Sequence, residues 1–233
     1  MSVLRDTLII ARNELRLEGR TKEILFTTSM FSLLMAVVSS LAFYLDRVSV
    51  LAIAPGILWL ALSFSGILAM SRSWLREGEW HVIDALLLSP ISRAALYAGK
   101  AIAALILLLL NATILTCFVT ILCHLSPFIS ENPARNIGFM AIFILAGLIG
   151  FVAPGTLFAS MSVRTKIREL TLSIILFPLC APALLVGVVA TRELFVGAPD
   201  LELWNWLRVL VAFDLVVVAI CPMLFERLFS SRS

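Results

Sequence analysis

Charged residues are scarce in this chain. Only 14% of its 233 residues are Asp, Glu, Lys or Arg, whereas 61% are apolar. A soluble globular domain carries about 25% charged residues. This composition therefore excludes an ordinary soluble domain and indicates an integral membrane protein. The small net charge of +3 gives no indication of nucleic-acid binding.

The motifs of common catalytic and nucleotide-binding sites are missing as well. The sequence has no GxxxxGK(S/T), HExxH or GxSxG, so it carries no P-loop of its own and we expect no enzyme activity. The four cysteines include no CxxC pair, and we expect neither a metal site nor a covalently bound cofactor. The two histidines, His81 and His124, are predicted to lie on opposite sides of the membrane, where they cannot share a site.

Long apolar runs dominate instead. About 20 apolar residues are needed for a helix to cross a hydrocarbon core of about 30 Å, and the runs lack the alternation of a β-barrel. We predict an all-α integral membrane protein with one transmembrane domain over residues 1–233. Its six spans are predicted near residues 24–45, 51–71, 101–125, 137–161, 170–190 and 208–224. The segment 191–207 is interpreted as a loop whose Trp204 and Trp206 lie at lipid headgroups or against a partner.

The distribution of Lys and Arg predicts the orientation. Fourteen of the 18 basic residues precede the first span or fall in the second loop, the fourth loop and the tail. The other four are Arg47, Arg135, Arg192 and Arg208. By the positive-inside rule, both termini and the segment 72–100 are expected in the cytoplasm.

Residues 1–23 are predicted to form a cytoplasmic amphipathic segment. Over residues 2–20, Leu4, Leu8 and other apolar residues share one stripe, and Arg5 and Arg12 lie along its flank. This pattern is typical of a helix in the membrane interface. The alternative is a helix that simply continues the first span.

Several residues inside the spans are candidates for bending or polar function. Proline removes a helix hydrogen bond and glycine allows close approach of a neighbouring backbone, so we expect kinks, close packing or gating at Pro55, Gly56, Pro154, Gly155, Pro178 and Pro182. Asp214 is an intramembrane acid and so a functional candidate; a pair with Arg208 or a water-exposed position near the outer interface would also explain it. Hydrogen bonds between spans are expected from Ser63, Ser65, Asn111 and Thr113.

The segment 72–100 reads RSWLREGEWHVIDALLLSPISRAALYAGK. Its first half has helical amphipathic spacing, with Trp80, Ile83 and Leu87 on one face and Glu77, His81 and Asp84 on the other. It is interpreted either as a plain connecting loop or as a surface helix offered to a partner.

Two stretches resemble a known family. Residues 54–100, beginning APGILWLALSFSGILAMSRSWLREGEW, are similar to the signature region of CcmB, the membrane permease of the cytochrome c maturation ABC transporter. Residues 150–187 are similar to the second half of that family. The LLxSP and Gly-Lys pattern also resembles other ABC-2 type permeases, whereas the Ala-Pro-Gly-Ile-Leu-Trp opening favours CcmB.

The resemblance implies an ABC-2 permease fold in a bacterial inner membrane and a set of partners. These are an ATP-binding subunit resembling CcmA, CcmC and CcmD, the haem chaperone CcmE, and a second permease copy or subunit, with haem as the transported or handled ligand. A permease without a nucleotide site must receive force through a surface element, so a coupling helix is expected at residues 77–88. The residues expected at the ATPase contact are Glu77, Gly78, Glu79, His81, Asp84, Leu86, Leu87, Ser89 and Pro90.

Three other functions remain open at this stage. The chain could be an ABC-2 permease for a lipid or drug, or a non-conducting scaffold of a haem-handling complex. A membrane-embedded enzyme would need a convergent set of acids or metal ligands, and the sequence offers only Asp214 and His124 for it.

Overall fold

The structure is a computed structural model that describes residues 3–42, 47–79, 92–123, 132–165 and 169–230. Within these ranges the chain is built from helices, which are α1 (Val3–Thr21), α2 (Glu23–Ala42), α3 (Arg47–Glu79), α5 (Arg93–Leu122), α7 (Pro133–Thr165), α8 (Glu169–Val196) and α9 (Asp200–Ser230). The six from α2 onward are long and apolar enough to cross a membrane. The predicted all-α membrane fold is confirmed.

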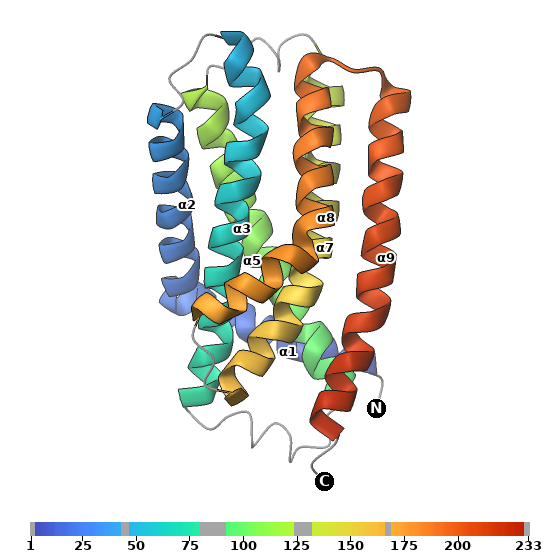
Figure 1. Cartoon of the computed structure of the whole chain (residues 1–233). Helices are drawn as coiled ribbons and strands as arrows, with labels where there is room; N and C mark the ends of the chain where they lie inside the picture. The colour runs from blue at the N-terminus through green and yellow to red at the C-terminus, as the bar shows by residue number, and fades with distance from the viewer. Residues whose placement is uncertain (1–2, 43–46, 80–91, 124–131, 166–168, 231–233) are drawn as a thin grey trace.

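The six long helices run side by side as one bundle, and α1 lies across it (Figure 1). Both chain ends are found at the end of the bundle where α1 lies, which we call the terminal end. Helix α3 is the most enclosed span: 72% of the residues in its apolar window are buried, against 28% in α2 and in α9. Helices α2, α5, α7 and α8 pack around α3, whereas α2 and α9 have the smallest buried share among the six spans.

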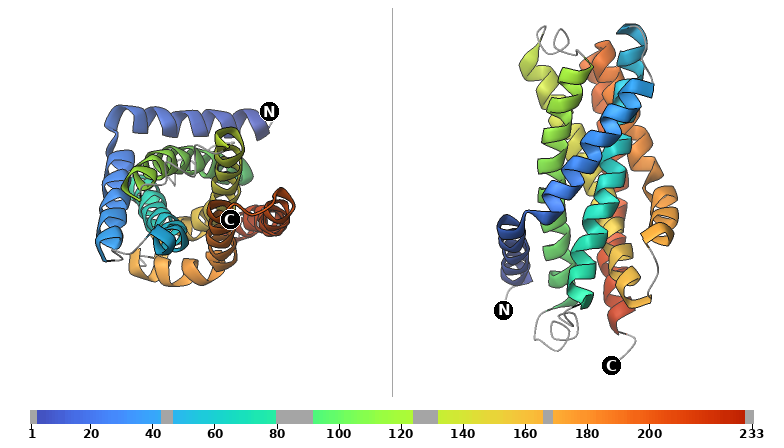
Figure 2. Two further views of the ribbon diagram at one scale, coloured as in Figure 1. Left: turned by 90° about the horizontal axis from the view of Figure 1, so that it is seen from above. Right: turned by 90° about the vertical axis from the view of Figure 1, so that its left-hand side faces the viewer.

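A sharp corner separates α1 from α2. Lys22 adopts a left-handed backbone with φ of 53°, and its N–H donates to the carbonyl of Glu18 at 2.6 Å, which ends α1. Seen along the bundle, α1 runs along one side and does not continue the direction of α2 (Figure 2). The prediction of an amphipathic helix is confirmed, and the alternative in which it continues the first span is wrong.

Two predicted boundaries need correction. Helix α5 begins at Arg93, eight residues before the predicted span, because Ser92 caps it by accepting a hydrogen bond from the Ala95 N–H at 3.2 Å. Helix α9 begins at Asp200, so the loop predicted over 191–207 is reduced to residues 197–199. Gly197, with φ of 82°, ends α8 there. Hydropathy alone misses such polar helix ends.

Glycines let α3 pack closely against α7 and α8. The Trp59 side chain of α3 is buried, and its Nε1–H donates to Thr191 Oγ1 of α8 at 3.0 Å. A Cβ atom on Gly187 would lie 2.7 Å from the indole, and a Cβ on Gly147 would clash with it more severely. We call Trp59, Gly147, Gly187 and Thr191 the indole slot. The slot fixes the three helices to one another in the middle of the bundle.

The predicted prolines all lie inside helices: Pro55 in α3, Pro154 in α7, and Pro178 and Pro182 in α8. Helix α8 turns sharply along its length instead of following the bundle axis (Figure 1). Gly155 is a close-packing point, because a Cβ there would lie 2.5 Å from the Met70 sulfur. No such neighbour lies near Gly56. A gating role for these residues stays a prediction.

Candidate functional site at the terminal end

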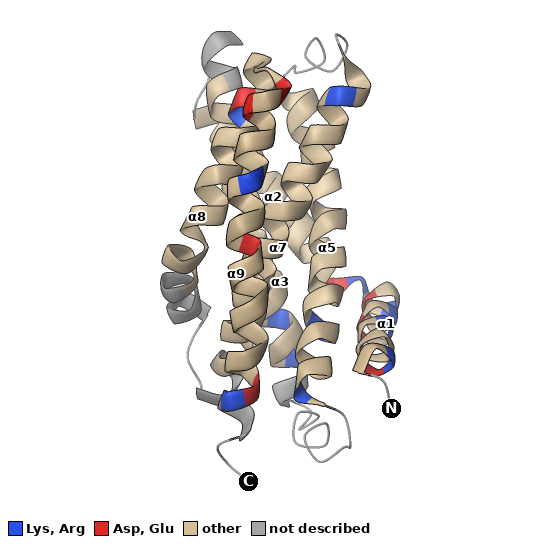
Figure 3. Cartoon of the chain, turned by 90° about the vertical axis from the view of Figure 1, so that its right-hand side faces the viewer, with Lys and Arg blue, Asp and Glu red and all other residues tan. Residues whose placement is uncertain are grey.

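Acidic and basic residues gather largely toward the two ends of the bundle (Figure 3). At the terminal end, helices α1, α2, α3 and α5 bring opposite charges together. We call this group the terminal clamp, which consists of Glu14, Glu18, Glu23, Arg72, Arg76 and Lys100. Each ion pair in it joins two helices.

Lys100 attaches α5 to α1. Its Nζ lies 3.2 Å from Glu14 Oε1 and 4.7 Å from the centre of the Trp74 ring, while the residue is only 3% exposed. A buried ammonium is tolerated when it is paired, and the aromatic face adds a cation–π attraction. From the sequence, Lys100 is expected in a loop. In the structure it lies in the second turn of α5 and is buried.

Close backbone contact brings α1 against this part of α5. A Cβ on Gly99 would lie 2.8 Å from Ile10 Cβ and 3.0 Å from the Thr7 carbonyl oxygen. Gly99 therefore allows the two helices to approach, and the adjacent Lys100 can reach Glu14. The Gly-Lys pair thus places α1 at this end of the bundle.

Glu18 joins three helices. Its Oε1 accepts a hydrogen bond from the Leu25 N–H at 2.8 Å, which satisfies a free donor in the first turn of α2, where Lys22 offers no capping oxygen. Its Oε2 lies 3.5 Å from Arg76 Nη2 of α3. The residue is 3% exposed, so both contacts form largely away from water.

Glu23 completes the clamp at the surface. Its carboxylate lies 3.6 Å from both Arg72 Nη1 and Arg76 Nη2. The Glu23 side chain is 60% exposed, and such pairs contribute about 0–1 kcal/mol. Glu18, and not Glu23, is therefore the principal anchor of Arg76.

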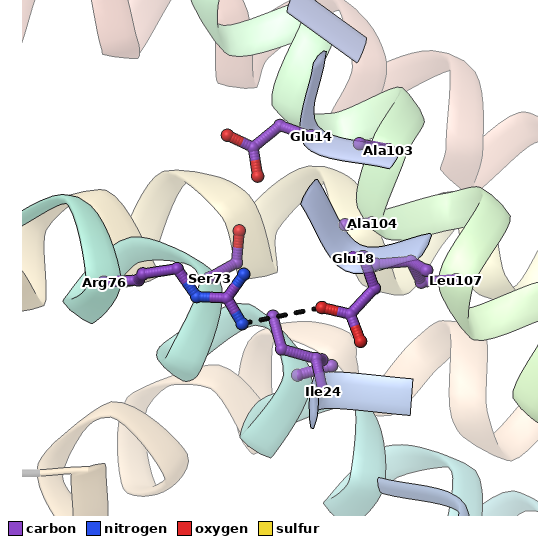
Figure 4. A pocket seen from close by; sticks show the side chains of 9 residues that line it. Glu14, Glu18, Ile24, Ser73, Arg76, Ala103, Ala104 and Leu107 are labelled. Carbon is purple, nitrogen blue, oxygen red and sulfur yellow. Dashed lines mark ion pairs between the residues drawn. The ribbon is translucent and has the colours of Figure 1, made fainter. Parts of the chain in front are cut away.

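A small cavity lies inside the clamp (Figure 4). Its volume is about 10 Å³, and its lining includes Glu14, Glu18, Ser73 and Arg76, whose side chains come from α1 and α3 (Figure 4). This volume is close to that needed by one water molecule, and water is stable only where such polar partners surround it. The space is far too small for an organic ligand.

The predicted ATPase-contact residues follow the clamp along the chain. The backbone of Glu77, Gly78 and Glu79 continues α3. The other predicted contact residues, His81, Asp84, Leu86, Leu87, Ser89 and Pro90, lie outside the described residues, as does His124. The clamp is therefore the last described set of side chains before the predicted coupling segment.

Asp214 lies apart from the clamp, near the middle of α9. It is 7% exposed, and its Oδ1 has no hydrogen-bond partner. This oxygen would lie 2.5 Å from a Cβ on Gly150 of α7. Among the described residues, Arg208 donates instead to Asn205 at 3.3 Å. The Arg208 pair and the water-exposed position considered for Asp214 are both wrong, because Asp214 is buried and lies six residues from Arg208, on another face of α9.

Neutral polar side chains connect some of the spans. The predicted hydrogen bonds between spans are confirmed for Ser65 and Asn111 but not for Ser63 and Thr113. Asn111 of α5 donates from Nδ2 to Ser65 Oγ of α3 at 2.9 Å and accepts at Oδ1 from Ser32 Oγ of α2 at 3.0 Å. Ser63 and Thr113 instead donate to carbonyls of their own helices. In the described part of the chain, no three His, Cys, Asp or Glu side chains gather as a metal site would require.

Residues 5–228 match the family described as CcmB protein. The chain belongs to the CcmB family. Two relatives are named Heme exporter protein B. The protein from Paracoccus denitrificans is 27% identical over 170 residues, which cover 73% of each chain. That from Bradyrhizobium diazoefficiens is 24% identical over 193 residues, which cover 83% of each chain.

Sequence reasoning on this CcmB-family chain missed Glu14 and Glu18. The available signal was their register, because residues 7, 11, 14 and 18 fall on one helical face, and Thr7, Ala11 and Glu18 are all buried. The predicted apolar stripe includes Leu4 and Leu8, which lie beside this packed face and are exposed. An acid that shares the packed stripe of an otherwise basic helix indicates an interhelical ion pair.

Proposed function

We propose that this chain is the permease subunit of an ABC transporter required for cytochrome c biogenesis in the bacterial inner membrane. CcmB-family membership, the name of both relatives and the six apolar helices support this proposal. Haem is the transported or handled ligand. The terminal end, with both termini, faces the cytoplasm, as the distribution of basic residues predicts.

The energy for this work comes from another subunit, because the sequence contains no P-loop. The proposed partners are an ATPase resembling CcmA, CcmC and CcmD, the haem chaperone CcmE reached through the complex, and a second permease copy or subunit. The ATPase binds the segment 77–90, with Glu77 and Asp84 among its contacts.

The terminal clamp is the observation that carries this mechanism. Arg76 precedes the segment by one residue and is paired with Glu18 of α1 and Glu23 of α2, while Lys100 joins α5 to Glu14. Displacement of the segment therefore moves the terminal end of α3 together with α1, α2 and α5. Ion pairs can follow such a movement, because Coulomb energy varies only as the inverse of distance.

Charge reversal tests the contact. The variant Glu77→Lys/Asp84→Lys should weaken copurification of the ATPase about tenfold, the change that accompanies a loss of about 1.4 kcal/mol in binding. The matched control Glu193→Lys/Glu202→Lys reverses two acids at the opposite end and should leave copurification unchanged. Wild-type ATPase recovery and wild-type stimulated ATP hydrolysis in the first variant would refute the proposed contact.

The identity of the transported molecule is tested by a separate experiment, which measures cytochrome c maturation. Deletion of the gene should abolish cytochrome c maturation, and a plasmid copy should restore it. Normal maturation in the deletion strain, with altered membrane lipid or drug export, would instead support a permease for those molecules. Maturation that persists after bulky residues block the interior of the spans would support a scaffold.

A further inference from the structure

Helix α1 has two chemically different sides. One side is packed on the bundle through Thr7, Ala11 and Glu18, which are 6%, 4% and 3% exposed. The other side carries arginines, which are Arg5, Arg12, Arg16 and Arg20, and all four are exposed. We call these the arginine row. Their spacing of seven, four and four residues places them along one line of an α-helix.

The arginine row has no partner in the described part of the chain. None of its four guanidinium groups forms an ion pair or a hydrogen bond with a described side chain. The acids of α1 lie elsewhere: Glu18 is buried, and Asp6 and Glu14 are half-buried. Four like charges therefore face outward with no compensating charge from their own helix.

Apolar side chains lie next to the row. Leu4 is 76% exposed and Leu8 is 64% exposed, and helical geometry places both between the packed side and the arginines. Exposed leucines of this size gain free energy only if something apolar covers them.

The level of α1 identifies the environment. Helix α2 has 20 residues, and at 1.5 Å per residue it extends about 30 Å, the thickness of the hydrocarbon core. Lys22, at the start of α2, therefore lies at the boundary between lipid tails and headgroups, and α1 turns there to run across the bundle (Figure 2). Its leucines are level with the upper acyl chains and its arginines with the headgroups.

We propose that the arginine row binds the phosphate groups of anionic phospholipids in the leaflet at the terminal end. Guanidinium groups bind phosphate oxygens through paired N–H donors, and Leu4 and Leu8 contact the acyl chains of the same lipids. The bound lipids hold α1 in the membrane plane, with its other face presenting Glu14 and Glu18 to the clamp. This inference does not depend on the cargo or on the ATPase.

The test uses the full chain reconstituted in nanodiscs of equal parts phosphatidylglycerol and phosphatidylcholine. After partial delipidation, native mass spectrometry counts the lipids of each class that remain bound. The wild type should retain phosphatidylglycerol preferentially. Arg12→Gln/Arg16→Gln should reduce that preference about thirtyfold, because each of the two basic residues contributes about 1 kcal/mol of attraction to an anionic leaflet.

Two matched variants make the result specific. Arg12→Lys/Arg16→Lys keeps the charge and should keep most of the preference. Arg192→Gln/Arg208→Gln removes two exposed arginines from outside α1 and should leave it at the wild-type value. The phosphatidylglycerol preference is compared between preparations with the same melting temperature, so that misfolding does not change the number of bound lipids.

Equal phosphatidylglycerol preference in the wild type and in Arg12→Gln/Arg16→Gln would overturn the proposal. The same result is expected if the arginine row binds a protein partner and not lipid. An equal loss in Arg192→Gln/Arg208→Gln would also overturn it, because the effect would then follow total charge. A wild-type preference that weakens strongly in 0.5 M salt would support it, since screening weakens surface attraction.

Discussion

Helix α3 is held by two different kinds of contact at two levels of the bundle. In the middle, the indole slot encloses the uncharged Trp59 side chain between Gly147 of α7 and Gly187 of α8. At the terminal end, Arg72 and Arg76 of the same helix form ion pairs with α1 and α2. Steric contact fixes the first level, and electrostatic attraction holds the second.

The two levels respond differently to displacement. Repulsion between packed atoms rises steeply over fractions of an ångström, and tight interiors cannot absorb added volume. Attraction between charges declines gradually with distance. Helix α3 is thus firmly seated in the middle and adjustable at its terminal end, where the predicted coupling segment begins.

The largest effect is expected in the indole slot. Gly147→Ala would place a Cβ atom in severe overlap with the Trp59 ring, so the cost should reach or exceed the upper end of the range of about 1–3 kcal/mol that is typical of overpacked interiors. The variant should show a lower melting temperature in detergent and less monodisperse protein by gel filtration. Gly138→Ala is the matched control on the same helix, because a Cβ there meets nothing within 4 Å.

A second-site change sharpens that test. Trp59→Leu removes the ring atoms that the new methyl group would meet, so Gly147→Ala should cost less in this background than in the wild type. Equal costs in both backgrounds would show that the slot is not the source of the strain.

A smaller effect is expected in the clamp. Glu18→Ala removes the acceptor for the Leu25 N–H and the buried partner of Arg76, and should lower the free energy of unfolding by about 1–3 kcal/mol. Glu18→Gln keeps an acceptor oxygen and should cost less. Glu23→Gln alters a side chain that is 60% exposed and should cost at most about 1 kcal/mol.

Thermal unfolding at low and high salt distinguishes these contributions. The Glu23 effect should fade in high salt, whereas the Glu18 effect should persist because its carboxylate is shielded from solvent. Equal destabilisation by Glu18→Gln and Glu23→Gln would contradict the assignment of Glu18 as the principal anchor.

Much of the fold could be predicted because membrane crossing imposes a length and a composition. All six spans follow from that constraint, and helix α1 follows from its amphipathic pattern. The starts of α5 and α9 could not be predicted in the same way, since α5 begins at the Ser92 cap and α9 follows the turn at Gly197. Hydropathy measures lipid compatibility and does not detect where backbone hydrogen bonding begins.

The candidate site was less accessible to sequence reasoning. The amphipathic spacing of the segment 77–90 predicts a surface helix. It does not indicate which other helix contacts Arg76, the residue just before the segment. The pairing of Arg76 with Glu18 requires the corner at Lys22, and the burial of Lys100 requires the close approach at Gly99. Both depend on tertiary contacts between segments that are far apart in the chain.

The smallest effect is expected for the uncharged polar contacts between the two levels. Asn111→Ala removes the hydrogen bonds from α5 to Ser65 of α3 and Ser32 of α2. Hydrogen bonds between membrane helices contribute about 0.6 kcal/mol on average and at most about 1.7 kcal/mol.

The control for Asn111→Ala is Thr113→Ala, whose exposed hydroxyl bonds only within α5. Its unfolding midpoint in a denaturing detergent titration should match the wild type, whereas that of Asn111→Ala should fall measurably but by less than that of Gly147→Ala. If Asn111→Ala proved as damaging as Gly147→Ala, polar bonding as well as steric fit would hold α3 in the middle of the bundle. The contrast between a sterically fixed middle and an electrostatically held end would then fail.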